Sequence, residues 1–170
     1  MTCSIDPSER DATERVLSRE PFIVRRCARW AECDPAGVVH TGRFGDYALS
    51  ATDLFRAHVI GRDWHRRNSS AGFGSPAKAI SLVFHSPLWP GDQFDIAVFV
   101  GEIRVRSMDL LLSATRSDDG RAIFRGRLSS ICVTAEDRTV AMPWPDDYRE
   151  RYRSYARHVP VPADLQQMGP

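Results

Sequence analysis

The sequence predicts an α+β domain in which one long helix covers a face of an antiparallel sheet. A wide apolar stripe at helical spacing lies between residues 41 and 61. One strand pattern precedes this helix, and four more follow it between residues 77 and 134, joined by tight turns. Because consecutive strands with short links pair antiparallel, the helix is left to cover one face of their sheet.

The first strand follows a polar N-terminal segment. Residues 1–19 are predicted to be an extension that holds a short helix near Pro7–Leu17. From residue 22 apolar and polar side chains alternate, and one face of this strand carries Phe22, Val24, Ala28 and Trp30. The stretch Glu32–Gly37 is rich in turn-forming residues, so the strand is expected to end there.

The helix is expected to span roughly 15–18 residues, within the usual range for a globular domain. Thr41 is a candidate cap at its start, and Gly61 a candidate stop at its end. Its apolar stripe consists of Phe44, Tyr47, Ala48, Ala51, Leu54 and Phe55. A polar loop is expected over residues 62–75.

The remaining strands follow the loop. They are expected over Ala77–Phe84, around the alternating stretches Phe94–Val100 and Met108–Ala114, and over Phe124–Thr134. A short basic helix is expected over Asp146–Arg157. The chain therefore divides into an extension (1–19), one domain (20–157) and a loose C-terminal tail (158–170).

Composition narrows the classes of function. The 170 residues are 42% hydrophobic and 26% charged, with a net charge of +1, which predicts a soluble globular domain rather than a nucleic-acid or membrane-surface binder. No signal peptide and no apolar run of about 20 residues is visible, so we expect a cytoplasmic protein. The four cysteines form no Cys-x-x-Cys pair, and neither a metal-ligating cluster nor a Gly-rich phosphate motif is present. We expect no bound metal and no cofactor.

Asp34 is the candidate catalytic carboxylate. It stands at a strand end just ahead of the long helix, where free N–H groups can hold an oxyanion. A carboxylate in this place could attack a thioester or activate water. An Asp before a Pro is also a common turn residue, and spacing alone favours that interpretation.

The stretch Arg29–His40, followed by Phe44 and Tyr47, resembles the signature of the 4-hydroxybenzoyl-CoA thioesterase family. In that family an Asp-Pro-Ala-Gly run closes the first strand and leads into the central helix. The resemblance extends more loosely from Phe22 to Tyr148. It implies a hotdog fold, with an antiparallel sheet wrapped around one long helix. It also implies a homodimer or a dimer of dimers, with sheets joined edge to edge and sites built across the interface.

The resemblance also implies roles for single residues. Asp34 would be the nucleophile or general base, and the backbone N–H near Thr41 would polarise the thioester carbonyl. Gly37, Val38 and Phe44 of the same signature are candidate substrate contacts. Ser75 and Pro76 resemble a segment that approaches the thioester from the partner subunit. Arg104 and Arg106 resemble a basic strand segment that contacts CoA phosphates.

The segment after the signature leaves three functions open. Family members often have an aromatic residue and then Pro-Asn-Tyr, whereas this chain has His40-Thr41-Gly42-Arg43-Phe44, so the shape of the acyl pocket is not given by the resemblance. His40 is a candidate for proton transfer, with a capping or pocket-lining role as the alternative. We expect an acyl-CoA thioesterase for an aromatic or medium acyl group, with CoA as part of the substrate. The alternatives are a hotdog-fold enoyl-CoA hydratase or dehydratase, and a non-catalytic module that binds an acyl ligand.

Overall fold

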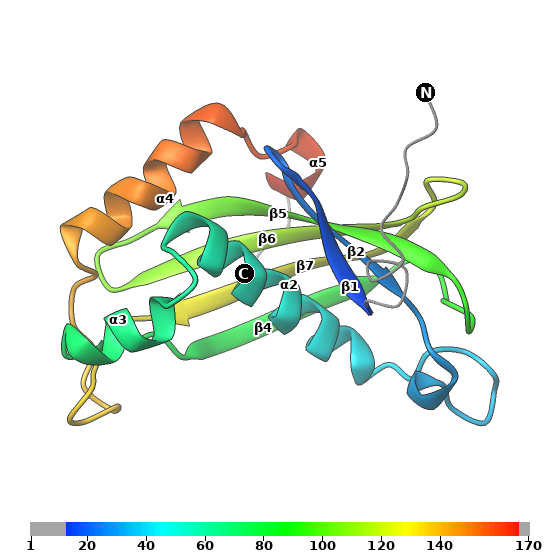
Figure 1. Cartoon of the computed structure of the whole chain (residues 1–170), viewed down its shortest axis with the longest axis horizontal. Helices are drawn as coiled ribbons and strands as arrows, with labels where there is room; N and C mark the ends of the chain where they lie inside the picture. Colours follow the sequence, from blue (N-terminus) through cyan, green and yellow to red (C-terminus); the bar gives the residue numbers. More distant parts are fainter. Residues whose placement is uncertain (1–12, 167–170) are drawn as a thin grey trace.

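A six-stranded antiparallel sheet in the order β1-β2-β5-β6-β7-β4 forms the framework of the protein (Figure 1). The computed structural model describes residues 13–166. The strands of this sheet are β1 (Glu14–Arg19), β2 (Phe22–Cys27), β4 (Ala77–Phe84), β5 (Gln93–Ile103), β6 (Ser107–Arg116) and β7 (Ala122–Ile131). Two short strands, β3 (Phe73–Gly74) and β8 (Val133–Thr134), pair beside it.

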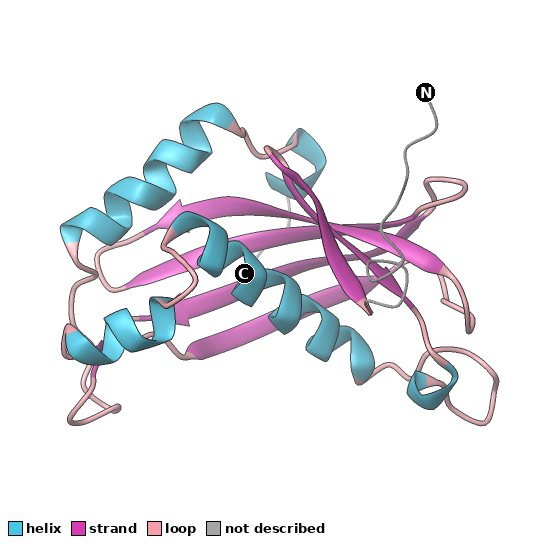
Figure 2. Cartoon of the chain, in the orientation of Figure 1, coloured by secondary structure: helices cyan, strands magenta, loops and turns pink. Residues whose placement is uncertain are grey.

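The predicted central helix is α2 (Arg43–Val59), and it crosses one face of the sheet (Figure 2). Its 17 residues match the expected length. The helix buries one stripe, which consists of Phe44, Tyr47, Ala48, Ala51, Thr52, Phe55 and Arg56. These side chains meet the apolar faces of the long strands, so the core lies between α2 and the sheet. The arrangement is the predicted antiparallel sheet around one helix.

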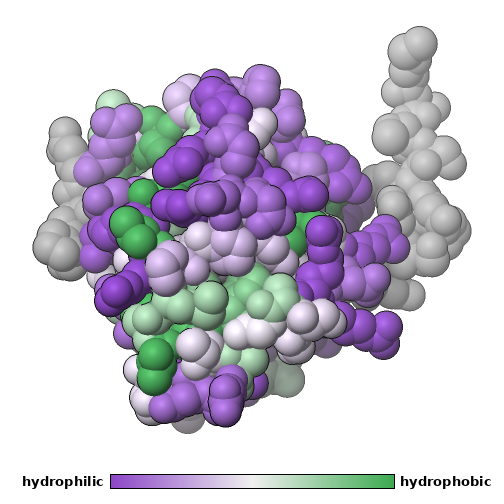
Figure 3. Space-filling view, turned by 90° about the vertical axis from the view of Figure 1, so that its left-hand side faces the viewer, coloured by the Kyte–Doolittle hydropathy of each residue, from purple (hydrophilic) through white to green (hydrophobic). Residues whose placement is uncertain are grey.

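Two more helices complete this layer. The first is α3 (Trp64–Ser70), within the predicted loop, and the second is α4 (Asp146–His158), close to the predicted basic helix. Tyr155 of α4 packs on Phe55 of α2, with ring centroids 4.9 Å apart, and the backbone N–H of Phe22 donates to the Tyr155 hydroxyl at 2.7 Å. The surface over α4 is hydrophilic, as the upper part of Figure 3 shows.

The predicted loose tail contains α5 (Ala163–Gln166), which packs on the opposite face of the sheet. Leu165 is 1% exposed, and Asp164 pairs with Arg125 of β7 at 2.5 Å. Neighbouring Phe124 of β7 packs on Phe44 of α2. Because side chains alternate along a strand, Arg125 points away from α2. The C-terminal segment therefore covers part of the outer face of the sheet.

The N-terminal segment differs from its prediction. Residues 14–17 lie in strand β1, which pairs antiparallel with β2, and not in a helix. The reason is that β1 satisfies the outer hydrogen-bonding edge of β2. The rest of the helix predicted near Pro7–Leu17, and residues 167–170 of the predicted tail, lie outside the described residues. Residues 14–19 and α5 both contact the domain that was predicted to span residues 20–157.

Smaller differences concern the ends of elements. Trp30 does not continue the first strand, since it begins a 3-10 helix, η1 (Trp30–Glu32), and is 76% exposed. Gly42, and not Thr41, occupies the N-cap position of α2, and no side chain caps this end. Gly61, with φ of +121°, follows the end of the helix as predicted. The predicted strand Phe124–Thr134 is divided at Cys132 into β7 and β8.

None of the helices in the described part of the chain is both long and apolar enough to span a membrane.

Candidate active site

The loop that carries Asp34 is a short hairpin whose sequence explains its shape. Cys33 and Val39 pair across it, and the Asp34 N–H donates to the Val38 carbonyl at 2.9 Å. The Gly37 N–H closes the turn on the Asp34 carbonyl at 2.9 Å. Pro is favoured at the second position of such a turn, and Gly37 has φ of +80°, a conformation that glycine adopts without strain. The Asp-Pro-Ala-Gly run thus specifies the turn locally.

The Asp34 carboxylate has one bound and one available oxygen. Its Oδ1 accepts the N–H of Ala36 at 2.8 Å, which fixes the direction of the side chain. Its Oδ2 has no hydrogen-bond partner within residues 13–166. The turn interpretation and the catalytic interpretation of Asp34 are therefore compatible, because one oxygen stabilises the turn and the other has no partner among the described residues.

The start of α2 offers one free backbone donor beside this loop. The Gly42 N–H donates to Nδ1 of His40 at 3.1 Å, and the Arg43 N–H donates to the His40 carbonyl at 2.9 Å. The Phe44 N–H reaches the Thr41 carbonyl at 3.3 Å. No acceptor for the Thr41 N–H is found among the described residues. This amide is a free donor at the start of α2, and its role toward a thioester carbonyl stays a prediction.

Asp34 and His40 line one open pocket of about 510 Å³. Its wall also contains three charged residues that were not among the predicted site residues, Glu32, Arg43 and Asp46. Arg43 and Asp46 pair at 3.2 Å, at the helical spacing i, i+3 that could have indicated them. The pocket thus contains the carboxylates of Glu32, Asp34 and Asp46 and the guanidinium of Arg43, near the N-terminus of α2.

Cys33 stands beside the candidate carboxylate. Its Sγ donates to the Arg29 carbonyl at 3.4 Å. Burial raises the pKa of the Cys33 thiol, and the Asp34 and Glu32 carboxylates raise it further. The thiol therefore stays protonated at neutral pH, so Cys33 does not supply a thiolate nucleophile in this wall.

The other signature residues, Val38 and Phe44, are not among the residues that line this pocket. Val38 is half-buried in the hairpin, whereas Phe44 is buried at 5% exposure in the first turn of α2. The Phe44 ring packs on Phe84 of β4, with centroids 5.1 Å apart, and on Phe124 of β7 at 5.8 Å. Phe44 therefore joins the first turn of α2 to the edge of the sheet.

Ser75 and Pro76 lie in a second pocket, of about 230 Å³, between α3 and the start of β4. Asn68 of α3, which is 5% exposed, donates from Nδ2 to Ser75 Oγ at 3.2 Å and accepts from the Tyr148 hydroxyl at 2.8 Å. Arg138 also lines this pocket. Within one chain, the structure does not bring Ser75 and Pro76 into the pocket of Asp34.

Arg104 and Arg106 lie in the turn between β5 and β6, and the prediction of a basic strand there is wrong. The reason is that the two strands end at Ile103 and resume at Ser107, so the pair closes a tight hairpin. Arg104 is held by Asp109, at 2.9 Å, and by Glu102. Arg106 makes no ion pair within the described part of the chain. Of the two, Arg106 is the one with a guanidinium left for a ligand.

Comparison with family models matches residues 28–168 to the thioesterase-like superfamily. The chain belongs to this superfamily. The match covers the Asp34 hairpin, α2 and the whole of the sheet that follows. Comparison with curated proteins gives no match.

Solved structures with the same fold include a 1,4-dihydroxy-2-naphthoyl-CoA thioesterase from Synechocystis. It is 17% identical, with a TM-score of 0.70, over 78% of this chain and 95% of that one. A protein from Staphylococcus aureus, solved in complex with CoA, is 13% identical with a TM-score of 0.75, over 94% and 97% of the chains. An Asp-to-Asn variant of 4-hydroxybenzoyl-CoA thioesterase, in complex with 4-hydroxybenzoyl-CoA, is 18% identical with a TM-score of 0.69, over 82% and 99%.

These comparisons confirm the predicted family resemblance and the predicted hotdog fold. The predicted enzyme class, a thioester hydrolase, is confirmed at the level of the superfamily. The roles of single residues in this chain stay predictions.

Proposed function

We propose that this protein hydrolyses an acyl-CoA thioester and that Asp34 is its catalytic carboxylate. The observation that carries the proposal is a free Asp34 Oδ2 in a pocket that His40 and Gly42 also line, together with a free N–H on Thr41, the residue between them in the chain. The carboxylate attacks the thioester carbonyl or takes a proton from the water that does so. The Thr41 N–H then stabilises the negative charge on the carbonyl oxygen. When Asp34 attacks, the C–S bond breaks as an acyl–Asp34 anhydride forms, and water then hydrolyses this anhydride to the free acid and the Asp34 carboxylate. When Asp34 acts as the base, the activated water displaces the thiolate directly. In both cases the CoA thiolate takes up a proton, and the products are a free acid and CoA. No cofactor beyond the substrate's own CoA takes part.

His40 has a defined protonation pattern in this scheme. Because its Nδ1 accepts the Gly42 N–H, a neutral His40 carries its proton on Nε2. It can therefore donate a hydrogen bond to the substrate, but it is poorly placed as a base through Nδ1. This arrangement supports Asp34 as the base or nucleophile. It also argues against a hydratase, which needs a basic histidine.

The second proposed feature is a homodimer formed through β4. This strand pairs with β7 on one side only, and its other edge is open within the described structure. It exposes Ile80 (46%), Val83 (48%) and Phe84 (46%). A long, flat and apolar strand edge is a template for pairing with another strand. We propose that two copies of β4 pair antiparallel about a two-fold axis, which closes this edge.

Such a dimer would bring the two pockets together. About a two-fold axis, the start of one β4 lies beside the end of the other. The end of β4 is Phe84, which contacts Phe44 at the start of α2. The partner subunit's Ser75 and the partner subunit's Pro76 would therefore approach the Asp34 pocket. Arg106 and Arg138 would be available to the phosphates of CoA.

The acyl group is proposed to be aromatic or of medium length. Phe44, which follows the pocket residue Arg43 in the chain, packs with Phe84 and Phe124, and the exposed ring of Phe84 would be covered in the dimer. Aromatic side chains offer both buried area and favourable ring contacts to such a group. The thioesterases named for dihydroxynaphthoyl-, gentisyl- and hydroxybenzoyl-CoA have the same fold.

A thioester panel with detection of the released thiol tests the proposal. The wild type should cleave at least one aromatic or medium acyl-CoA, and Asp34→Asn should lower kcat by about 100- to 10,000-fold. Asp46→Asn is the matched control, because Asp46 lines the same pocket and pairs with Arg43 at its mouth. It should change kcat less than about threefold. Equal activity of Asp34→Asn and the wild type would remove Asp34 from the mechanism.

A second assay separates the alternatives. Hydration of crotonyl-CoA without thioester cleavage would establish the hydratase and overturn our choice. Binding of acyl-CoA with neither reaction would establish the non-catalytic module. Rapid quenching of a single turnover then separates the two roles of Asp34, since a nucleophile leaves a transient acyl adduct on the peptide that contains it and a general base does not.

A further inference from the structure

Arg26 is a buried charge on the face of β2 that packs against α2. Phe22 and Val24 occupy the same face at alternate positions and are fully buried. Arg26 is 7% exposed, in a place where the pattern calls for an apolar residue. Taking a guanidinium out of water costs several kcal/mol unless it is paired and hydrogen-bonded. The partners of Arg26 therefore decide what it does.

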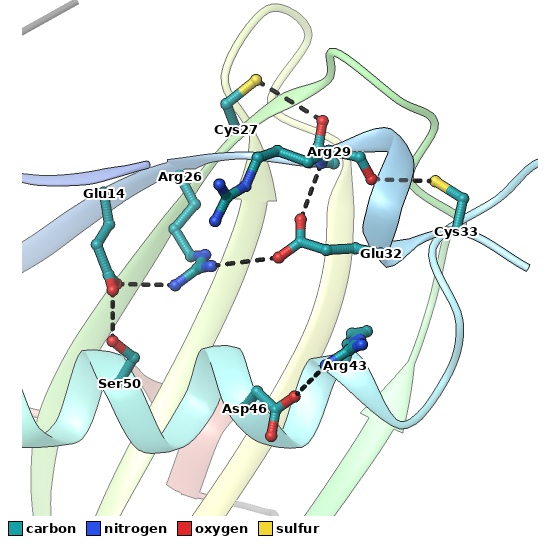
Figure 4. A network of polar contacts seen from close by, with 10 residues as sticks. Glu14, Arg26, Cys27, Arg29, Glu32, Cys33, Arg43, Asp46 and Ser50 are labelled. Atoms are coloured by element: carbon teal, nitrogen blue, oxygen red, sulfur yellow. Dashed lines mark hydrogen bonds and ion pairs between the residues drawn. The ribbon is translucent and has the colours of Figure 1, made fainter. Parts of the chain in front are cut away.

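Four elements meet at this side chain (Figure 4). Arg26 Nη1 lies 2.9 Å from Oε2 of Glu14 in β1, and its Nη2 lies 3.5 Å from Oε1 of Glu32 in η1. Ser50 of α2 donates to Oε1 of Glu14 at 2.6 Å. The Arg26 guanidinium also stacks over Tyr47 of α2, 4.4 Å from the ring centroid. The network thus joins β1, β2, η1 and α2.

Tyr47 is a neutral member of this cluster. Burial raises the pKa of its hydroxyl far above the usual value, and the Glu32 carboxylate raises it further. The charged members are therefore one guanidinium and two carboxylates. Because Arg26 lies between Glu14 and Glu32, it cancels the repulsion that the two carboxylates would otherwise exert on each other.

Glu32 connects this network to the hairpin of Asp34. Its Oε2 accepts the Arg29 N–H at 2.8 Å, and its backbone carbonyl accepts the His40 N–H at 2.9 Å. Glu32 therefore hydrogen-bonds to residues on both sides of the Asp34 hairpin, Arg29 before it and His40 after it. Asp34 is only two residues beyond Glu32 in the chain. A displaced Glu32 side chain would loosen the hydrogen bonds that place Asp34 and Thr41 relative to each other. A misplacement of about 1 Å at such a site can cost as much as 100-fold in rate.

We infer that Arg26, held between Glu14 and Glu32, is a positioning residue that fixes the Asp34 hairpin and makes strand β1 part of the catalytic architecture. The inference rests on the proposed function for its effect on rate, but its effect on the loop is independent of that function. Glu14 does not touch the hairpin, so its influence on Asp34 passes through Arg26. The N-terminal strand thereby gains a role beyond covering the edge of β2.

The test uses the full chain with Arg26→Met, which keeps an unbranched apolar stem and removes the charged guanidinium. Amide hydrogen exchange of a peptide spanning residues 30–42 should become at least about tenfold faster. Arg56→Met is the matched control for this readout, because Arg56 is also 7% exposed, pairs with Asp53 at 2.9 Å and lies 5.3 Å from the ring of Trp64. It should leave the exchange of the hairpin as in the wild type.

Thioester hydrolysis supplies the second readout. Arg26→Met should lower kcat by about 10- to 100-fold with KM changed less, since the loop places the reacting groups. Arg25→Met, which breaks the ion pair with Asp95 on the other face of the same strand, should keep wild-type kcat. Arg26→Lys keeps the charge and should restore part of kcat. Glu14→Gln gives the same test through the more exposed partner if Arg26→Met does not fold.

Each outcome decides one of the two proposals. If Arg26→Met or Glu14→Gln leaves both hairpin exchange and kcat as in the controls, the positioning role is wrong. If the wild type cleaves no thioester but the hairpin still loosens selectively, the proposed function fails and the structural role of Arg26 stands. A fall in kcat that Arg25→Met shares equally would assign the effect to stability and overturn the inference.

Discussion

Phe84 at the open edge of β4 and Phe44 in the first turn of α2 pack with their ring centroids 5.1 Å apart. The edge proposed to pair in a dimer and the helix start proposed to bind the thioester carbonyl are therefore one packed unit. Pairing of β4 and formation of the site should depend on each other. This dependence can be tested without touching any residue of the pocket.

Ile80→Lys should separate the proposed dimer. Ile80 is at the middle of β4 and 46% exposed, so a two-fold axis would place two lysines side by side. Like charges at such a contact cost several kcal/mol, which weakens the dimer by at least about 100-fold. Sedimentation velocity should show that the variant is a monomer. Its rate of thioester hydrolysis should be far below that of the wild type. Val16→Lys, on the opposite edge strand at 39% exposure, should stay dimeric. A wild-type monomer with full activity would contradict the prediction.

The C-terminal segment predicts a dimer rather than a dimer of dimers stacked through the outer face of the sheet. Leu165 and the Asp164–Arg125 ion pair occupy this face. Leu165→Ala should destabilise the fold by about 2 kcal/mol, as read from urea unfolding, and should increase light scattering by uncovering the apolar side chains beneath. Mass photometry of the wild type should give a dimer. A wild-type tetramer in which Leu165 stays packed on the sheet of its own chain would contradict the assignment of a dimer.

Replacement of two glycines near the site by alanine should change the free energy of unfolding in opposite directions. Gly37 has φ of +80°, so Gly37→Ala should cost about 1 kcal/mol of unfolding free energy and should reduce kcat by moving Asp34. Gly45 lies within α2, and a methyl group there meets nothing within 4 Å. Gly45→Ala should therefore stabilise the protein by about 0.5–1 kcal/mol. Thermal unfolding and initial rates check both. Equal effects of the two substitutions would argue against a strained turn at Gly37.

His58 should make stability depend on pH. Burial lowers its pKa, and the charge of Arg19 lowers it further. The unfolded chain therefore binds a proton more readily than the folded one, so the free energy of unfolding is greatest above about pH 6.5 and decreases as the pH falls below that value. His58→Phe keeps the stacking on Phe22 and should flatten this slope between pH 7 and 5 in urea titrations. An unchanged slope would assign the dependence to other groups.

The sequence predicted the parts that local chemistry determines. The Asp34 hairpin follows from Pro35 and Gly37, and α2 follows from an apolar stripe that Phe44 and Phe55 begin and end. Arg26 could not be found in this way, because its partner Glu14 lies in a segment whose local pattern suggested a helix. Only the open edge of β2 makes that segment a strand.

The proposed approach of Ser75 to the Asp34 pocket depends on a contact between two copies of the chain. Within one copy it lies in a pocket with Asn68, away from Asp34. The family resemblance implied that a partner subunit contributes to the site. The exposed apolar side chains of β4 give a physical reason to expect such a partner. Exposure of Ile80 and Phe84 cannot be read from a strand pattern, since an edge strand and a central strand alternate alike.

The hydrogen bond from the Phe22 amide to the Tyr155 hydroxyl joins residues that are 133 positions apart. A nascent chain therefore cannot fold this domain progressively from its N-terminus. The contacts of β2 are complete only after α4 has been synthesised, and the outer face of the sheet is covered only after Leu165 has been synthesised. Until Leu165 has left the ribosome, strand edges and apolar faces stay open to other chains, and folding that depends on such distant contacts is slow. Synthesis of this protein should for that reason depend on chaperones far more than the small size of the domain suggests.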